Sequence, residues 1–417
     1  MEKLAELLEA RKRLISTSMS LAHGTPLHIV RGDMQYLHAS DGTRYLDLVN
    51  NVSHVGHCNP HVVEAGQRQM AVLNTNSRYV YNGLTEYLSR LSETLPDSLD
   101  VGFLVNSGSE ANELAIRLAR AHTGNHDMAV IEGAYHGHTG MLIDLSPYKF
   151  RGLGGKGDPE KWVHVLPLPD SYRRPEADFL EEARTGLRDS GQVAALLIES
   201  MLSCAGQIEL PDGYLSEVAS YVRRIGGLLI ADEVQVGFGR VGTHMWAFED
   251  TGVVPDIVVM GKPIGNGHPM AAVFTTREIA SSFGGMEFFS TFGGNPVSCA
   301  IGMAVMDVIE KDDLMARARD LGFRFKTGLN SLKDSHELIG DVRGRGLFLG
   351  IEMVRDHESL APAPEEATDF VNRMRDEGVL LSTDGVYHNV VKIKPPMVLS
   401  EKDVDDTLEK MDSILSS

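Results

Sequence analysis

The chain has few cysteines and a shortage of positive charge. Only three of its 417 residues are cysteine (Cys58, Cys204 and Cys299), and three widely spaced thiols do not make a disulfide framework. This usage predicts a reducing compartment, which we expect to be the cytoplasm. Lysine and arginine total 39, against 58 aspartate and glutamate residues. The net charge of −19 argues against nucleic acid or an anionic membrane as a partner.

Long apolar runs are also missing, and no segment reaches the length of a membrane span. Residues 1–14 have a charged amphipathic pattern that predicts a helix, without the apolar centre of a signal peptide. The chain has 42% hydrophobic and 23% charged residues, which is typical of a globular protein. It is longer than one typical domain and can bury a large core.

Short apolar segments alternate with helical patterns from about residue 46 to about residue 309. This alternation predicts an α/β architecture with a mostly parallel sheet covered by helices. The last hundred residues differ. Residues 342–352 predict a strand of a smaller domain, and a final helix is expected to begin at Ser400, with Asp403 in a capping-box-like position.

Ligands of parallel sheets bind at the carboxyl ends of the strands. In this chain the ends of the apolar segments carry polar residues: Asn106, Glu132, Glu199, Asp232 and Lys262. A lysine there can form a Schiff base with pyridoxal phosphate (PLP), and an aspartate can pair with the pyridinium nitrogen. A single loop lysine is more often solvated, and a single aspartate more often caps a turn. The pair therefore needs a phosphate site and a ring-stacking group nearby.

A candidate phosphate site follows the apolar segment 101–105. The polar stretch 106–109 leads into helical spacing that ends near Gly124. A helix N-terminus attracts phosphate through its free N–H groups and its dipole, although such a loop alone is no more than an ordinary N-cap.

A candidate stacking residue, Tyr135, follows the apolar segment 128–131. Single tyrosines are more often half-buried packing residues than cofactor contacts. His136 and His138 lie beside it. Without cysteines or carboxylates at ligand spacing, the two histidines do not predict a metal site.

Together these segments resemble the class III aminotransferases, a family of fold-type I PLP enzymes. The matching segments keep the family's order over most of the chain: 106–112, 135–137, 230–235, 261–262 and 290–296. The resemblance implies an aspartate aminotransferase-like fold. It also implies a large PLP-binding domain at 46–309 and a smaller α+β domain formed by 1–45 and 310–417.

The same resemblance implies how PLP is held. Lys262 would bind it covalently and Asp232 would pair with its ring nitrogen. Tyr135 would stack on the ring, and Gln235 would bond the phenolic oxygen. Further contacts would come from Ser107, His136 and Glu199.

The cofactor phosphate would be held by Gly108 and Ser109 of the same chain. Thr291 would reach that phosphate from a second subunit. The resemblance therefore implies a homodimer with shared active sites.

Other segments narrow the resemblance to the phospho-lyase branch of the family, which acts on ethanolamine phosphate or phosphohydroxylysine. These segments are 50–58, 73–79, 146–151 and 381–385. A phosphorylated substrate of an acidic protein needs local cations. Arg78, Lys149 and Arg151 are the candidates for the substrate phosphate, although each also reads as an ordinary surface charge.

One departure from the aminotransferase pattern concerns residues 391–396. Where those enzymes usually carry an arginine before a Pro-Pro pair, this chain has Lys394. Arginine is the fork-shaped partner of a carboxylate, whereas lysine is a point charge. The substitution weakens the expectation of an α-amino acid substrate.

The sequence therefore predicts a PLP-dependent β-elimination of phosphate from O-phosphoethanolamine or a related phosphorylated amine. The main alternative is a class III ω-aminotransferase acting on a terminal amine. A catalytically inactive PLP-binding protein is a third possibility, against which the presence of Lys262 and Asp232 argues.

Overall fold

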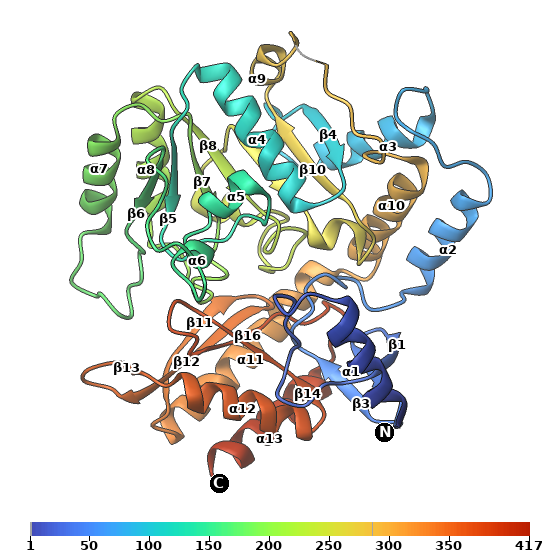
Figure 1. Ribbon diagram of the computed structural model, residues 1–417, viewed down its shortest axis with the longest axis vertical. Coiled ribbons are helices and arrows are strands. Elements are labelled where there is room, and N and C mark those ends of the chain that lie inside the picture. Colours follow the sequence, from blue (N-terminus) through green and yellow to red (C-terminus); the bar gives the residue numbers. More distant parts are fainter. Residues whose placement is uncertain (1, 286) are drawn as a thin grey trace.

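A computed structural model describes residues 2–285 and 287–417, and its centre is a sheet of seven strands (Figure 1). The strand order is β4-β10-β9-β8-β7-β5-β6. Neighbouring strands from β9 to β6 run parallel, and β10 is antiparallel to both β4 and β9, so the predicted mostly parallel sheet is confirmed. The strands are β4 (Val101–Val105), β5 (Met128–Ile131), β6 (Val163–Leu166), β7 (Ala195–Glu199), β8 (Leu228–Asp232), β9 (Ile257–Met260) and β10 (Ala271–Thr275).

Helices cover both faces of this sheet. Successive side chains of a strand point to opposite faces. In β7, Leu197 packs in one cluster with helix α4 (Gly108–Thr123), whereas Leu196 and Ile198 pack in another with α7 (Phe179–Ser190) and α8 (Tyr214–Arg224). Burial on both faces explains why these strands read as continuous apolar runs.

The ends of the helices agree with their sequence signals. Helix α4 ends at Gly124 in the left-handed conformation. Helix α13 begins after Ser400, which forms a capping box with Asp403 as predicted. The predicted N-terminal helix is α1, and Met1 lies outside the described residues. The remaining helices are α1 (Glu2–Leu14), α2 (Pro60–Met70), α3 (Asn82–Ser92), α5 (Gly140–Asp144), α6 (Pro147–Phe150), α9 (Arg277–Ser282), α10 (Pro296–Lys311), α11 (Leu314–Ser335), α12 (Pro364–Asp376), α13 (Glu401–Leu415) and the 3₁₀ turns η1 (Ala247–Thr251) and η2 (Lys262–Gly265).

Two smaller sheets lie below the large one in Figure 1, close to both termini. One of them combines an N-terminal and a C-terminal segment of the chain, because residues 46–47 of β3 pair in parallel with residues 379–380 of β14. The division into a large domain, 46–309, and a smaller domain, 1–45 with 310–417, stays a proposal. Its boundaries fall inside β3 and in the last turn of α10. The strands of these sheets are β1 (Ile29–Asp33), β2 (Tyr36–Ala39), β3 (Arg44–Asp47), β11 (Ile339–Arg345), β12 (Phe348–Asp356), β13 (Ala361–Pro362), β14 (Val379–Leu380), β15 (Ser382–Asp384) and β16 (Val390–Ile393).

The prediction of one strand over residues 342–352 is wrong. The chain turns back within this segment, and β11 and β12 form an antiparallel hairpin. Gly344 and Gly346 make the reversal possible, with φ of 103° and 56°. A Cβ on Gly344 would lie 2.0 Å from the carbonyl oxygen of Phe348. These two glycines therefore form a turn and not part of a continuous strand.

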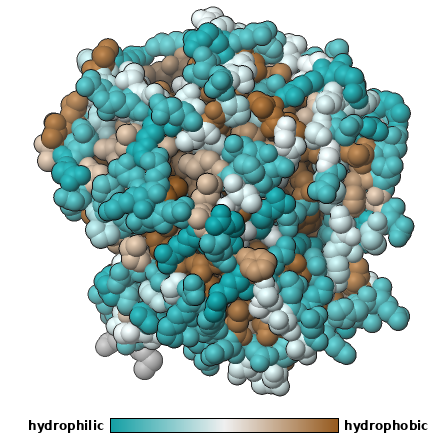
Figure 2. All heavy atoms as spheres, turned by 180° about the vertical axis from the view of Figure 1, so that it is seen from behind, coloured by the Kyte–Doolittle hydropathy of each residue, from teal (hydrophilic) through white to brown (hydrophobic). Residues whose placement is uncertain are grey.

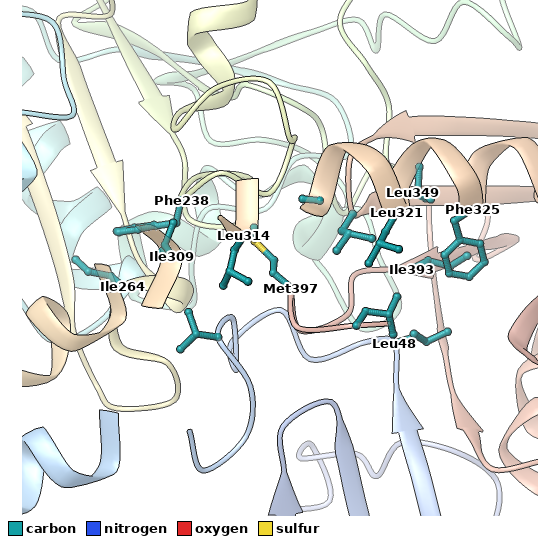
Figure 3. Packing of buried hydrophobic residues seen from close by; sticks show 14 of the residues in the cluster. Leu48, Phe238, Ile264, Ile309, Leu314, Leu321, Phe325, Leu349, Ile393 and Met397 are labelled. Atoms are coloured by element: carbon teal, nitrogen blue, oxygen red, sulfur yellow. The ribbon is translucent and has the colours of Figure 1, made fainter. Parts of the chain in front are cut away.

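One apolar core runs from the large sheet into the smaller ones. Figure 3 shows Leu314 and Met397 between Phe238 on one side and Leu349 on the other, and all four belong to a single buried cluster. By contrast, the face of the molecule seen in Figure 2 is mostly hydrophilic, with apolar side chains exposed in several separate places. The shared core fixes the smaller sheets against the edge of the large sheet where the candidate site lies.

A fully buried arginine reinforces this junction. Arg240 donates to the carbonyl oxygens of Leu347 and Pro395, both at 2.9 Å, and to Nδ1 of His54 at 3.1 Å. Nε2 of His54 in turn donates to the carbonyl oxygen of Phe238 at 2.7 Å. Burial lowers the pKa of Arg240 to about 9. The hydrogen bonds compensate part of the lost hydration, since Nε of Arg240 is buried without a partner among the described residues, and they tie together three distant parts of the chain.

Candidate active site

The carboxyl ends of the parallel strands meet at Asp232, the last residue of β8. Its side chain is buried, and Oδ2 accepts hydrogen bonds from Nδ2 of Asn112 at 2.9 Å and from Nδ1 of His136 at 2.8 Å. Oδ1 accepts from the backbone N–H of Val234 at 3.1 Å. Because a carboxylate only accepts, His136 must donate from Nδ1. Three donors therefore hold one carboxylate in a fixed orientation at the edge of the sheet.

Lys262 follows β9, the neighbouring strand, and opens η2 with φ of 34°, which is unusual for a residue other than glycine. The preceding Gly261 packs against the start of α4. A Cβ there would lie 3.5 Å from Cα of Gly108 and 3.0 Å from Cγ1 of Val234. The lysine loop and the candidate phosphate loop are therefore in contact, as expected for two parts of one site.

The candidate phosphate loop forms a helix N-terminus at the predicted place. Ser107 is the N-cap of α4, and its hydroxyl accepts from the N–H of Glu110 at 3.2 Å. The N–H groups of Gly108 and Ser109 are in the first turn, where they have no intrahelical acceptor. Oγ of Ser109 lies 3.1 Å from Nδ1 of His138. An anion bound here would meet free donors and the positive end of the helix dipole.

Glu199 ends β7 and lies fully buried beside this group. It accepts from the backbone N–H of Ser203 at 3.0 Å and from that of Tyr135 at 3.4 Å. Burial raises the pKa of Glu199 to about 7. The neighbouring His136 opposes this rise, and the neighbouring Asp232 adds to it. The half-buried Tyr135 is thus attached through its backbone to the end of the central sheet.

Gln235 lies three residues beyond Asp232, and its Oε1 accepts from two donors. Nδ2 of Asn51 lies at 3.2 Å and Nζ of Lys394 at 3.3 Å. From the sequence, Lys394 stood out only as a departure from a pattern, and no role was predicted for Asn51 or Asn112. Both asparagines lie in segments that carry the family resemblance, 50–58 and 106–112, but each contacts a side chain more than a hundred residues away.

The three candidates for the substrate phosphate do not lie together. Nζ of Lys149 lies 5.7 Å from the ring centre of Tyr135 and 5.3 Å from that of Tyr148. Arg151 pairs with Glu132. It lines a cavity of about 580 Å³ bounded by α6 and the 386–388 loop.

Arg78 lies apart from the other two candidates, at the loop that carries Thr291. It pairs with Glu287 at 2.7 Å and lies 4.1 Å above the ring of Phe289. Thr291 itself is exposed in the single chain.

No metal centre or membrane helix stands out in the described part of the chain. Within 2–285 and 287–417, no three potential metal ligands come together, and no helix is both long and apolar enough to cross a bilayer. The three cysteines are free thiols.

The side chains gathered here fit pyridoxal phosphate. A helix N-terminus suits its phosphate, the buried Asp232 suits a protonated ring nitrogen, and Lys262 supplies an amine just beyond the adjacent strand. His136 leaves Nε2 buried without a hydrogen-bond partner among the described residues. Buried polar atoms in proteins nearly always have a hydrogen-bond partner, and a bound cofactor could supply one here.

Comparison with known proteins agrees with this description. The model of the family "Aminotransferase class-III" matches residues 19–415, and the chain belongs to this family. A protein of Drosophila melanogaster, "Alanine--glyoxylate aminotransferase 2-like", is 48% identical over 97% of this chain and 85% of its own length. "Ethanolamine-phosphate phospho-lyase homolog 1" of Caenorhabditis elegans is 41% identical over 99% and 93%.

A solved structure extends the likeness to three dimensions. A phospholyase from Arthrobacter in complex with phosphoethanolamine superimposes with a TM-score of 0.93, is 40% identical, and covers 99% of both chains. The family and its fold-type I architecture, both expected from the sequence, are therefore confirmed, and pyridoxal phosphate is the cofactor.

The raised pKa of Glu199 gives a prediction about stability and pH. A carboxyl whose pKa is about 7 in the folded protein and near 4.5 in the unfolded chain binds its proton more tightly when folded. The unfolding free energy therefore falls as pH rises between these values, by roughly 3 kcal/mol at most. We expect Glu199→Gln to lack this loss. The unfolding free energy of the variant minus that of the wild type should therefore be larger at pH 8 than at pH 5.

Urea unfolding of the two proteins side by side, at saturating cofactor, measures this difference. The pH dependence that both proteins share cancels in the comparison. An equal stability difference at both pH values would contradict the assignment of a proton to Glu199.

Proposed function

We propose that this chain is a phospho-lyase. It would eliminate phosphate from O-phosphoethanolamine, or a related phosphorylated amine, to give acetaldehyde, ammonia and inorganic phosphate. The observation that carries the proposal is the placement of two lysines. Lys149 lies beside the ring of Tyr135, whereas Lys394 is buried and donates to Ser203 and Gln235. A cation is thus available to a phosphate, and no arginine fork faces an α-carboxylate from position 394.

The relatives support this proposal and also supply its competitor. Two of the similar proteins named above are phospho-lyases by name, and one of them binds phosphoethanolamine. The 48% identical relative carries an aminotransferase name, which keeps an ω-aminotransferase acting on a terminal amine as the second candidate. Release of phosphate without an amino acceptor separates the two reactions.

In this proposal the residues around Asp232 hold the cofactor. Asp232, oriented by Asn112 and His136, keeps a proton on the ring nitrogen. Lys262 binds the cofactor covalently and Gln235 bonds its phenolic oxygen. The other contacts come from Ser107, Gly108, Ser109, Tyr135, His136, Glu199 and, from a second subunit, Thr291.

The chemistry then depends on where protons are held. When bound, PLP supplies an electron-withdrawing ring that delocalises the charge left on the substrate carbon. Nζ of Lys262 would take a proton from the substrate carbon that bears the nitrogen. Lys149 and Arg151 bind the phosphate, so that the C–O bond to the adjacent carbon breaks with its electron pair on the leaving oxygen. Water converts the released product into acetaldehyde and ammonia.

The same proposal includes a homodimer with shared sites. Among the exposed apolar side chains, six lie in the stretch 63–80 and two, Phe289 and Phe292, in the stretch 289–292, and an apolar groove runs between α2 and α10. Exposed apolar area of this kind often marks a protein interface. Thr291 lies in the second stretch, and Arg78 contacts it through Phe289, so both would serve the partner's site. A cytoplasmic location is part of the proposal and is supported by the three free thiols.

A panel of amines tests the activity directly. Wild-type enzyme with PLP should release phosphate from O-phosphoethanolamine without any keto acid, and Lys262→Ala should release none. Unphosphorylated ethanolamine and terminal diamines, each with pyruvate as acceptor, test the alternative. Amino transfer from these amines, with no phosphate release from any phosphorylated amine, would overturn the lyase proposal.

The role of Lys149 in binding phosphate gives a second prediction. Lys149→Ala should raise KM for O-phosphoethanolamine about tenfold or more, because a hydrogen bond to a charged group is lost. PLP affinity should stay unchanged. Lys161→Ala, which removes an exposed lysine from the same acidic protein, is the matched control. Arg78→Ala and Arg151→Ala are measured alongside, and the proposed phosphate site is wrong if none of the three raises KM selectively for phosphorylated amines.

Mixed dimers test the shared site. Lys262→Ala and Thr291→Ala homodimers should both be impaired. If Thr291 serves the partner's cofactor, the mixed dimer has one site with Lys262 and Thr291 intact, and it should recover about half of the wild-type activity. If Thr291 served its own chain, no site in the mixed dimer would be intact and activity would not return.

A further inference from the structure

Lys394 is a lysine whose side chain is almost completely buried, which is rare for a charged residue. Only 2% of it is exposed, and its Nζ donates to Oγ of Ser203 at 2.7 Å and to Oε1 of Gln235 at 3.3 Å. Oδ2 of Asp384 lies 3.8 Å away. Burying an ammonium costs free energy unless its donors are satisfied, so this set of partners keeps the side chain in one place.

The contact with Gln235 decides how the Gln235 amide is turned. Nδ2 of Asn51 also donates to Oε1 of Gln235, at 3.2 Å. Neither a lysine ammonium nor an asparagine NH₂ can accept a hydrogen bond, so the atom between them must be the amide oxygen. A flipped amide would place its NH₂ group against two donors. The NH₂ of Gln235 is therefore directed away from Lys394, toward the side where Sγ of Cys204 lies 4.0 Å from it.

We propose that Lys394 is a positioning residue, which fixes the Gln235 amide so that its N–H points at the phenolic oxygen of PLP. That oxygen carries negative charge and needs a donor, and an amide free to rotate would present its own oxygen part of the time. The inference rests on the contact between Gln235 and PLP that we proposed above. It gives the lysine at position 394 a role within this site other than binding a substrate carboxylate.

The charges around Lys394 are compatible with this role. Burial lowers the pKa of Lys394 to about 8, and the nearby Asp384 opposes that change. The other titratable groups that face it are Lys392, Cys204 and Lys262. At neutral pH the side chain is mostly an ammonium, with three hydrogens to donate.

The pH midpoint of the visible absorbance of the PLP-loaded enzyme reports on the hydrogen bond to the phenolic oxygen. A donor stabilises the anionic form, so its loss raises the midpoint. We expect Gln235→Ala to raise it by about one pH unit, the size of a hydrogen bond to a charged group. Lys394→Met should raise it in the same direction. The double variant should match Gln235→Ala alone, because Lys394 acts through Gln235.

Lys392→Met is the matched control. Lys392 contacts the same Oδ2 of Asp384, at 3.0 Å, and removing it deletes a neighbouring cation without touching Gln235. It should leave the midpoint unchanged. A shift as large as that of Lys394→Met, or additive shifts in the double variant, would mean that Lys394 acts by charge alone and would overturn the positioning role.

The outcomes separate this inference from the proposed site. If Gln235→Ala leaves the midpoint unchanged, the proposed contact between Gln235 and PLP is wrong. If Gln235→Ala shifts it and Lys394→Met does not, the contact stands and the role of Lys394 is wrong. If Lys394→Met does not fold, Lys394→Gln serves as a second uncharged variant, and the same non-additivity with Gln235→Ala is required of it.

Discussion

The site depends on a buried carboxylate that must be satisfied from three directions. Asp232 lies at the end of a central strand, where water cannot solvate it, and Asn112, His136 and the N–H of Val234 replace that water. Asn112 belongs to α4, whose first turn is the candidate phosphate site, and His136 follows the candidate stacking residue. Compensating one charge thus fixes the positions of two other parts of the site.

The remaining polar side chains extend from this group in a connected series. Ser203 donates its N–H to Glu199 and accepts from Lys394 through its hydroxyl. Lys394 also donates to Gln235, which lies three residues after Asp232. The hydrogen bonds therefore return to the segment that follows β8. In such a network the loss of one member leaves the others unsatisfied, and effects of single substitutions are not additive.

The sequence predicted those parts of the fold that local signals specify. The start of α13 at Ser400, the end of α4 at Gly124 and the burial of β7 and β8 all follow from capping and apolar patterns, and the structure confirms them. The hairpin at 339–356 was missed because apolar residues on both sides of Gly344 and Gly346 were taken as one strand, although glycine is the residue best suited to the left-handed conformation of a turn. The contacts of Lys394 and Arg78 could not be predicted either, because they join residues that are distant in sequence.

The pairing of β3 with β14 has a consequence for synthesis of the chain. Residue 46 pairs with residue 379, so roughly 330 residues must be translated before β3 meets its parallel neighbour. At roughly 5–20 residues per second this takes on the order of half a minute. During that time the N-terminal strands have an unpaired edge, which is a hazard for aggregation. The native neighbour of β3 is therefore among the last parts of the chain to leave the ribosome, although β3 is among the first.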